Sequence, residues 1–109
     1  MSAHVDRGAD RRTAERVAVR FVATYRSPHT TAEGLVTDLS RRGLFLAGGA
    51  HDAIGTRAVV EVRLADRQLT LMGKVARHHD GGLGFCFDDL ADHARRQIAN
   101  IVLSAHSAR

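Results

Sequence analysis

Two short groups of residues have the chemistry to recognise a nucleotide. Arg12 and Arg16 are four positions apart, and a guanidinium can pair with phosphate, stack on a purine or donate to the O6/N7 edge of guanine. Asp38, Ser40 and Gly43 form the second group. A carboxylate accepts hydrogen bonds from the guanine ring N–H and amine, a hydroxyl bonds a base or phosphate, and glycine permits close backbone approach. Together these residue types suit an anionic guanine nucleotide.

Each group alone also has a simpler interpretation. Arginines four apart are common as solvated charges, and an Asp-x-Ser-x-x-Gly segment is often only a turn, because Asp and Ser side chains bond nearby backbone. The chain has 16 Lys and Arg against 12 Asp and Glu, a net charge of +4, and Lys74 is the only lysine. Arginine suits bidentate recognition of phosphate and guanine, but a GC-rich genome would also favour it. Only the positions of the arginines can therefore distinguish a binding site from a general bias in composition.

Length and composition exclude several classes of protein. A chain of 109 residues is one small domain. The single cysteine, Cys86, excludes an internal disulfide and a multi-cysteine zinc site, and it fits a reducing compartment. No segment approaches the roughly 18 apolar residues of a membrane span, and the polar segment from Met1 to Asp10 is no secretory signal. We therefore expect a cytoplasmic protein that does not insert into a membrane.

Period-two alternation of apolar and polar residues dominates the chain after Arg16 and predicts short strands. Turn-forming residues separate them, and short strands at regular spacing indicate an all-β antiparallel barrel or sandwich. The predicted strands are Val17–Tyr25, Glu33–Leu39, Leu44–Ala47, Ala58–Leu64, Leu69–Val75 and Leu83–Phe87.

Helical spacing replaces this alternation near the C-terminus. Apolar residues recur at three- and four-residue intervals from Leu90 to Leu103, which predicts a helix that lays its apolar stripe across an open end of a barrel. Asp88 or Asp89 would supply the N-cap. We expect one domain over residues 11–103, flanked by a flexible tail at 1–10 and a fraying tail at 104–109.

Three other features favour a structural interpretation. His78 and His79 are adjacent in a predicted turn and would point apart, so we expect no metal site there. Cys86 should lie on the opposite strand face from Phe85 and Phe87, as a small packing residue. Ser40 has no histidine beside it in sequence. We therefore expect no enzymatic activity.

In combination and order, the two motifs resemble those of PilZ domains, the bacterial receptor modules for cyclic di-GMP. The Arg-x-x-x-Arg motif matches Arg12 and Arg16 just before the first strand. The Asp/Asn-x-Ser-x-x-Gly motif matches Asp38, Ser40 and Gly43 and leads into Leu44-Phe45-Leu46. The similarity covers about Arg11 to Leu103, and it includes Gly55-Thr56, the segment Gly82–Phe87 and the closing helix.

The resemblance implies a six-stranded antiparallel barrel of the PilZ type with a C-terminal helix. It also implies that Arg12 and Arg16 grip phosphate and guanine while Asp38, Ser40 and Gly43 contact a base from the barrel surface. Arg11 directly precedes the first motif arginine, which in relatives goes with a stacked cyclic di-GMP dimer. No cofactor or metal is implied.

The expected function is that of a cyclic di-GMP receptor or adaptor. The ligand would order the N-terminal arginine loop against the barrel and alter a surface that binds an unidentified effector protein. Two alternatives stay open: an interaction barrel that works without ligand, and nonspecific nucleic-acid binding through the arginines. The low aromatic content, 5% of residues, counts against a platform for single-stranded nucleic acid, and the intact ligand motifs argue against a ligand-independent barrel.

Overall fold

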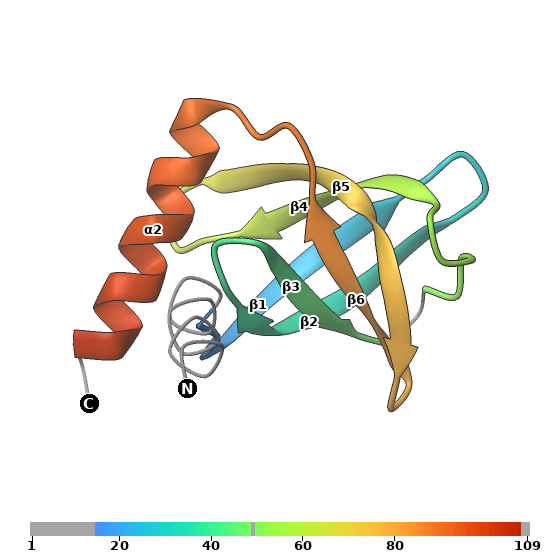
Figure 1. Cartoon of the computed structure of the whole chain (residues 1–109), viewed down its shortest axis with the longest axis horizontal. Coiled ribbons are helices and arrows are strands. Elements are labelled where there is room, and N and C mark those ends of the chain that lie inside the picture. Colours follow the sequence, from blue (N-terminus) through green and yellow to red (C-terminus); the bar gives the residue numbers. More distant parts are fainter. Residues whose placement is uncertain (1–14, 49, 108–109) are drawn as a thin grey trace, which may run out of the picture.

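The computed structural model describes residues 15–48 and 50–107. These residues form six strands followed by one helix (Figure 1). The strands are β1 (Val17–Arg26), β2 (Thr31–Leu39), β3 (Gly43–Ala47), β4 (Arg57–Arg63), β5 (Gln68–His79) and β6 (Gly82–Phe87), and the helix is α2 (Asp92–Ser107).

The six strands close into an antiparallel barrel in the order β1-β2-β3-β6-β5-β4. The predicted six-stranded barrel with a C-terminal helix is therefore confirmed, and the alternative of a sandwich is excluded. Strand alternation builds its core: in β5, Leu69, Leu71 and Val75 are buried while Thr70 and Lys74 are exposed. Period-two patterns of this kind put one face of each strand inward, away from water.

Helix α2 covers one end of the barrel, where it contacts β1 and β5 (Figure 1). Its buried residues are Ala94, Ile98 and Val102, spaced by four, so a single stripe faces the barrel. The helix begins at Asp92 and ends at Ser107, so the predicted bounds of Leu90 and Leu103 were wrong at both ends.

The predicted N-cap was also wrong. Asp89 adopts a left-handed conformation with φ 53° three residues before the helix. The Asp88 carboxylate pairs with Arg57 at 2.9 Å instead of capping backbone. Two consecutive aspartates before an apolar stripe look like a cap signal in sequence, but here they belong to the connection that leaves β6.

The structure corrects two further predictions. His78 and His79 lie in β5 and not in a turn; the turn is Asp80-Gly81, where both residues have positive φ. The side chain of Cys86 faces away from the core as predicted, but it is exposed and so is not a packing residue.

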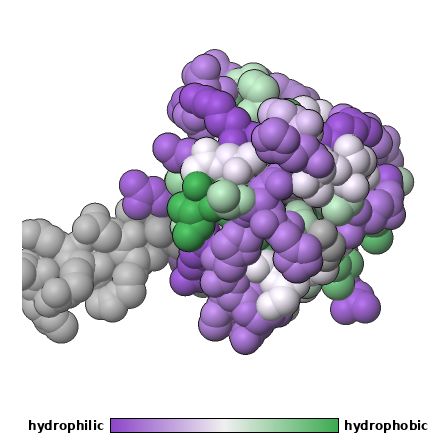
Figure 2. All heavy atoms as spheres, turned by 90° about the vertical axis from the view of Figure 1, so that its right-hand side faces the viewer, coloured by the Kyte–Doolittle hydropathy of each residue, from purple (hydrophilic) through white to green (hydrophobic). Residues whose placement is uncertain are grey.

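A carboxylate holds the end of the barrel away from α2. Asp52 accepts hydrogen bonds from the hydroxyls of Tyr25 and Thr30, both at 2.7 Å, and from Ser27. These bonds tie the segment between β3 and β4 to the hairpin of β1 and β2. The surface at this end is mostly hydrophilic, with small separated apolar groups (Figure 2).

Candidate ligand-binding surface

The turn between β2 and β3 is organised by the Ser40 side chain. Its hydroxyl oxygen accepts hydrogen bonds from the backbone N–H groups of Arg42 (3.1 Å) and Gly43 (3.2 Å), and it donates to the Gly43 carbonyl (3.3 Å). A hydroxyl has one donor and two acceptor sites, so all three are occupied. Ser40 is also 5% exposed. Here Ser40 shapes the turn, and a direct contact with a base stays a prediction.

Gly43 is required by the packing of two strands. A Cβ at this position would lie 2.2 Å from the Phe85 carbonyl oxygen on β6. Gly43 is the first residue of β3, and it is not among the glycines with positive φ. The close approach that we expected from this glycine is therefore an approach of β3 to β6.

Asp38 faces outward from β2 in a row of paired residues that crosses five strands. It pairs with Ala18 on β1 and with Phe45 on β3; Phe45 pairs with Gly84 on β6, and Gly84 with Arg77 on β5. Neighbouring strands are about 4.8 Å apart, so Arg77 lies about 14 Å from Asp38 along this row. The Asp38 carboxylate and the Arg77 guanidinium thus lie on opposite sides of one continuous surface.

A second outward row runs beside the first and begins at the motif turn. Gly43 pairs with Cys86, and Cys86 pairs with Lys74. At the β6 position of the first row stands Gly84, which has no side chain of its own. The position of a Gly84 Cβ lies 3.0 Å from Arg77 Cγ and 3.2 Å from Arg77 Nε, so the Arg77 side chain extends over Gly84.

Sequence reasoning missed Lys74 and Arg77 as members of this surface. The alternation of β5 showed that Lys74 points outward, but only the register places it across Cys86 from the motif glycine. A register shift between Val75 and Arg77 then changes the face expected for Arg77 from simple alternation.

The structure brings Arg16 to the same corner of the barrel as the motif turn. Arg16 is exposed and directly precedes β1. The next residue, Val17, pairs with Leu39 at the end of β2, so Arg16 enters the barrel beside the residue that opens the turn. The start of β1 and the turn between β2 and β3 lie on the side of the barrel nearer α2 in Figure 1. Arg11 and Arg12 lie outside the described residues.

The described residues present polar side chains on the outward rows and contain no cluster of metal-ligating groups. Within residues 15–48 and 50–107, no group of three or more His, Cys, Asp or Glu side chains could hold a metal ion. The helix of this part of the chain is not long and apolar enough to span a bilayer. The two outward rows present the Asp38 carboxylate, the Arg77 guanidinium, the Lys74 ammonium and the exposed Cys86 thiol.

Comparison with known proteins identifies the family. The family profile described as "PilZ domain" matches residues 10–104, nearly the whole chain. The chain belongs to the PilZ domain family. PilZ domains are a receptor family for cyclic di-GMP, and they are binding modules in general. No curated protein matches the sequence.

Solved PilZ structures share the fold at low sequence identity. The PilZ domain of CeSA from a cellulose synthesizing bacterium is 15% identical with a TM-score of 0.71, over 84% of this chain and 97% of that one. The PilZ domain of YcgR from Escherichia coli, solved with c-di-GMP, is 19% identical with a TM-score of 0.70, over 90% and 93%. The Bacillus subtilis inhibitor of motility (MotI/DgrA) is 15% identical with a TM-score of 0.74, over 86% and 50%.

Proposed function

We propose that this PilZ domain is a cytoplasmic cyclic di-GMP receptor or adaptor that has no enzymatic activity and needs no cofactor. Its ligand site comprises Arg11, Arg12 and Arg16 on one side and the turn from Asp38 to Gly43 on the other. The observation that carries this proposal is the pairing of Val17 with Leu39, which puts Arg16 beside the turn that Ser40 holds.

We infer that ligand binding orders the arginine half of this site against a turn that is already formed. The turn is held by four hydrogen bonds between Ser40 and the backbone of Arg42 and Gly43. The arginine segment precedes β1, and ordering it on the barrel would cost about 1–2 kcal/mol of backbone entropy per residue. Several charged hydrogen bonds are needed to offset that cost, each worth about 1.5–3 kcal/mol. A ligand with two phosphates and two guanines can supply them.

The outward rows provide room for more than one guanine. From Asp38 the surface continues across Phe45 and Gly84 to Arg77, and from Gly43 across Cys86 to Lys74. A stacked dimer of cyclic di-GMP, bound with help from Arg11, would use this wider area. The ordered arginine segment would then present a changed surface to an effector protein.

Titration calorimetry with cyclic di-GMP and, separately, GTP tests the proposal. The wild type should bind cyclic di-GMP in preference to GTP, and Arg16→Ala should lose about 1.5–3 kcal/mol of binding free energy. Arg20→Ala is the matched control, because Arg20 is also exposed and lies on β1. Equal affinity of the wild type and Arg16→Ala would contradict the assigned site. Binding to DNA with a steep salt dependence and no cyclic di-GMP preference would instead indicate nonspecific nucleic-acid binding.

A further inference from the structure

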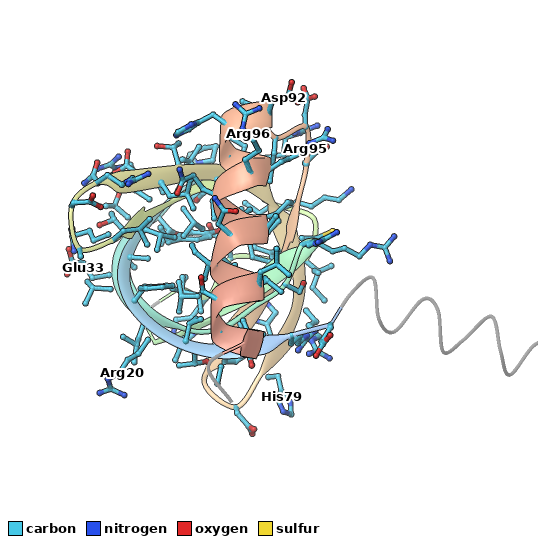
Figure 3. The ribbon with its side chains drawn as sticks, turned by 90° about the vertical axis from the view of Figure 1, so that its left-hand side faces the viewer. Arg20, Glu33, His79, Asp92, Arg95 and Arg96 are labelled. Carbon is cyan, nitrogen blue, oxygen red and sulfur yellow. The ribbon has the colours of Figure 1, made fainter. Side chains whose placement is uncertain are left out.

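A pocket of about 660 Å³ lies between the motif turn and α2. Arg41 and Arg42 of the turn line one side, and Arg95 and Arg96 of α2 line another. We call it the arginine pocket. Figure 3 shows Arg95 and Arg96 projecting from the beginning of α2. The two arginine pairs come from segments more than 50 positions apart in sequence, so the pocket exists only in the folded chain.

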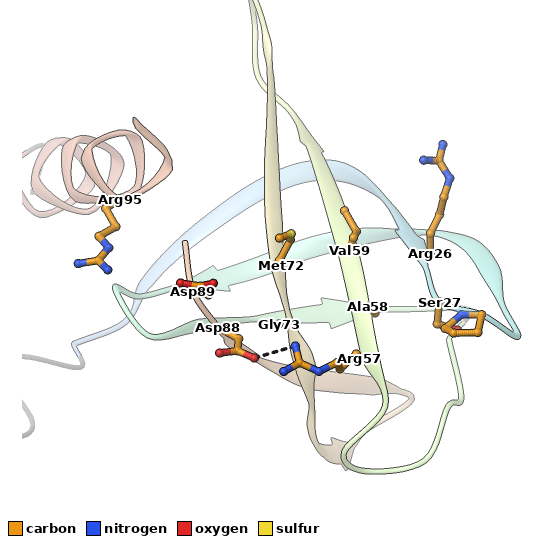
Figure 4. Close-up of a pocket in the computed structure, with 11 residues that line it drawn as sticks. Arg26, Ser27, Arg57, Ala58, Val59, Met72, Gly73, Asp88, Asp89 and Arg95 are labelled. Atoms are coloured by element: carbon orange, nitrogen blue, oxygen red, sulfur yellow. Dashed lines mark ion pairs between the residues drawn. The ribbon is translucent and has the colours of Figure 1, made fainter. Parts of the chain in front are cut away.

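The charges of the arginine pocket are unbalanced. All four arginines are exposed, and none of their side chains forms an ion pair or hydrogen bond within residues 15–48 and 50–107. Two carboxylates, Asp88 and Asp89, also line it. Asp88 is already paired with Arg57 at 2.9 Å in the adjoining pocket (Figure 4). The guanidinium groups therefore exceed the carboxylates available to them.

The floor of the arginine pocket is apolar. Phe87 and Leu90 are partly buried and pack against the core, and Ile98 is 1% exposed. An apolar floor between two pairs of cations is complementary to an apolar side chain flanked by carboxylates. Long arginine stems can cover the apolar part of such a segment while their charged ends pair with it.

One wall of the arginine pocket is the ligand motif itself. The Arg42 carbonyl accepts a hydrogen bond from the backbone N–H of Phe87 at 2.8 Å. The Arg42 N–H in turn donates to the Ser40 hydroxyl. A change in the turn on ligand binding would therefore be transmitted through Arg42 to Phe87 in the floor of the pocket.

We propose that the arginine pocket docks an acidic segment of a partner protein that carries an apolar residue between its carboxylates. This inference rests on the proposed function, because it names the surface through which a cyclic di-GMP receptor would reach its effector. A second copy of the chain fits poorly, since each copy carries a net charge of +4 and would repel the other. A flat anionic membrane surface cannot reach the floor of a concave pocket.

The test uses a panel of fluorescein-labelled octapeptides, each with Leu, Ile, Met or Phe at the centre and Asp or Glu on both sides. Fluorescence anisotropy is measured with the full chain, with and without saturating cyclic di-GMP. At least one peptide should bind, and Arg95→Ala/Arg96→Ala should weaken it at least tenfold. Arg20→Ala/Arg67→Ala removes the same charge at exposed positions outside the pocket, and should change affinity less than twofold.

Several results would overturn the inference. The first is that no peptide binds, with or without cyclic di-GMP. The second is that the control variant weakens peptide affinity as much as Arg95→Ala/Arg96→Ala does. The third is that phosphatidylglycerol vesicles bind in an arginine-dependent way while no peptide binds. Calorimetry separates this inference from the proposed function: Arg95→Ala/Arg96→Ala should retain cyclic di-GMP affinity within about twofold, and a parallel loss would make the pocket part of the nucleotide site. A wild type that binds peptide but not cyclic di-GMP would contradict the proposed function alone.

Discussion

The Ser40 side-chain oxygen accepts a hydrogen bond from the Gly43 backbone N–H at 3.2 Å, which joins the serine and the glycine of one ligand motif into a single turn. The same oxygen accepts from Arg42 and donates to the Gly43 carbonyl. The motif is thus partly a folding element, and its residues divide between those that face outward, such as Asp38, and those that hold the turn.

Replacing Ser40 with alanine should destabilise the fold. The change leaves two backbone N–H groups without their acceptor beside a buried position, and we expect the free energy of unfolding to fall by about 1–3 kcal/mol. Urea denaturation measures this effect, and Ser40→Thr is the control that keeps the hydroxyl. An unchanged unfolding free energy with a large loss of cyclic di-GMP affinity would instead show that the hydroxyl contacts the ligand.

Gly43→Ala should be more damaging than an alanine substitution at Gly55. The new Cβ at position 43 would meet the Phe85 carbonyl oxygen at 2.2 Å, and backbone atoms cannot move aside without separating β3 from β6. We expect a loss of about 1–3 kcal/mol or more from overpacking, together with weaker ligand binding. Gly55 has open space and φ 93°, so Gly55→Ala reports backbone strain alone, about 1–2 kcal/mol. Thermal unfolding of both variants compares them; equal losses would show that the contact with β6 is unimportant.

Stability should fall in acid through Asp52. Hydrogen bonds from Ser27, Thr30 and Tyr25 lower the pKa of the Asp52 carboxyl from its ordinary value of 3.8. A lowered folded-state pKa means that the stabilisation is present above pH 3.8 and is lost as the pH falls through the lower folded value. Burial, followed by the hydrogen bond that Tyr25 donates to Asp52, raises the pKa of the Tyr25 phenol, so it stays protonated and donating. The stability difference between wild type and Asp52→Asn, measured by urea denaturation, should therefore shrink as the pH falls below about 4.

Asp66→Asn is a useful control for that pH profile. Hydrogen bonding and charge attraction from Arg67 lower the pKa of Asp66 as well. The two residues are adjacent in sequence, so their interaction persists in the unfolded chain and contributes little to the pH dependence of folding. A profile of Asp66→Asn that changes with pH as strongly as that of Asp52→Asn would contradict this explanation.

Cys86 can report ligand binding, because it is the only cysteine in the chain and its side chain is exposed. It pairs with Gly43 on one side and Lys74 on the other. Cyclic di-GMP that covers the outward rows should slow its reaction with Ellman's reagent several-fold, whereas GTP should not. The Asp38→Ala variant should lose the protection. An unchanged labelling rate at saturating cyclic di-GMP would place the ligand away from β3 and β6.

Sequence patterns predicted the strands well where a strand buries alternate residues, as β5 does with Leu69, Leu71 and Val75. The patterns failed where local conformation is set by tertiary contacts. Asp88 pairs with Arg57 across the fold, so the apparent cap before α2 does not form. Barrel closure was implied by the family resemblance and could not be read from alternation, which a sandwich shares.

Only part of the candidate site could be predicted from sequence, because tertiary contacts also determine its shape. The motif spacing identified Asp38, Ser40 and Gly43, but the internal bonding of Ser40 depends on the shape of the turn. Lys74 and Arg77 join the surface through pairing across β6, and the shift between Val75 and Arg77 cannot be foreseen from residue types. The pairing of strands that are distant in sequence, and not local conformational preference, determines which cationic side chains share a surface with Asp38 and Gly43.

The closed order β1-β2-β3-β6-β5-β4 has a consequence for how this domain can signal. Every strand of the closed barrel has a neighbour on both sides, which leaves a partner little free edge on which to add a strand of its own. Closure also protects the domain from edge-to-edge aggregation. Recognition must then pass through side chains on loops, turns, α2 and the outward faces of the strands, where a few substitutions can change the partner without disturbing the backbone pairing of the barrel.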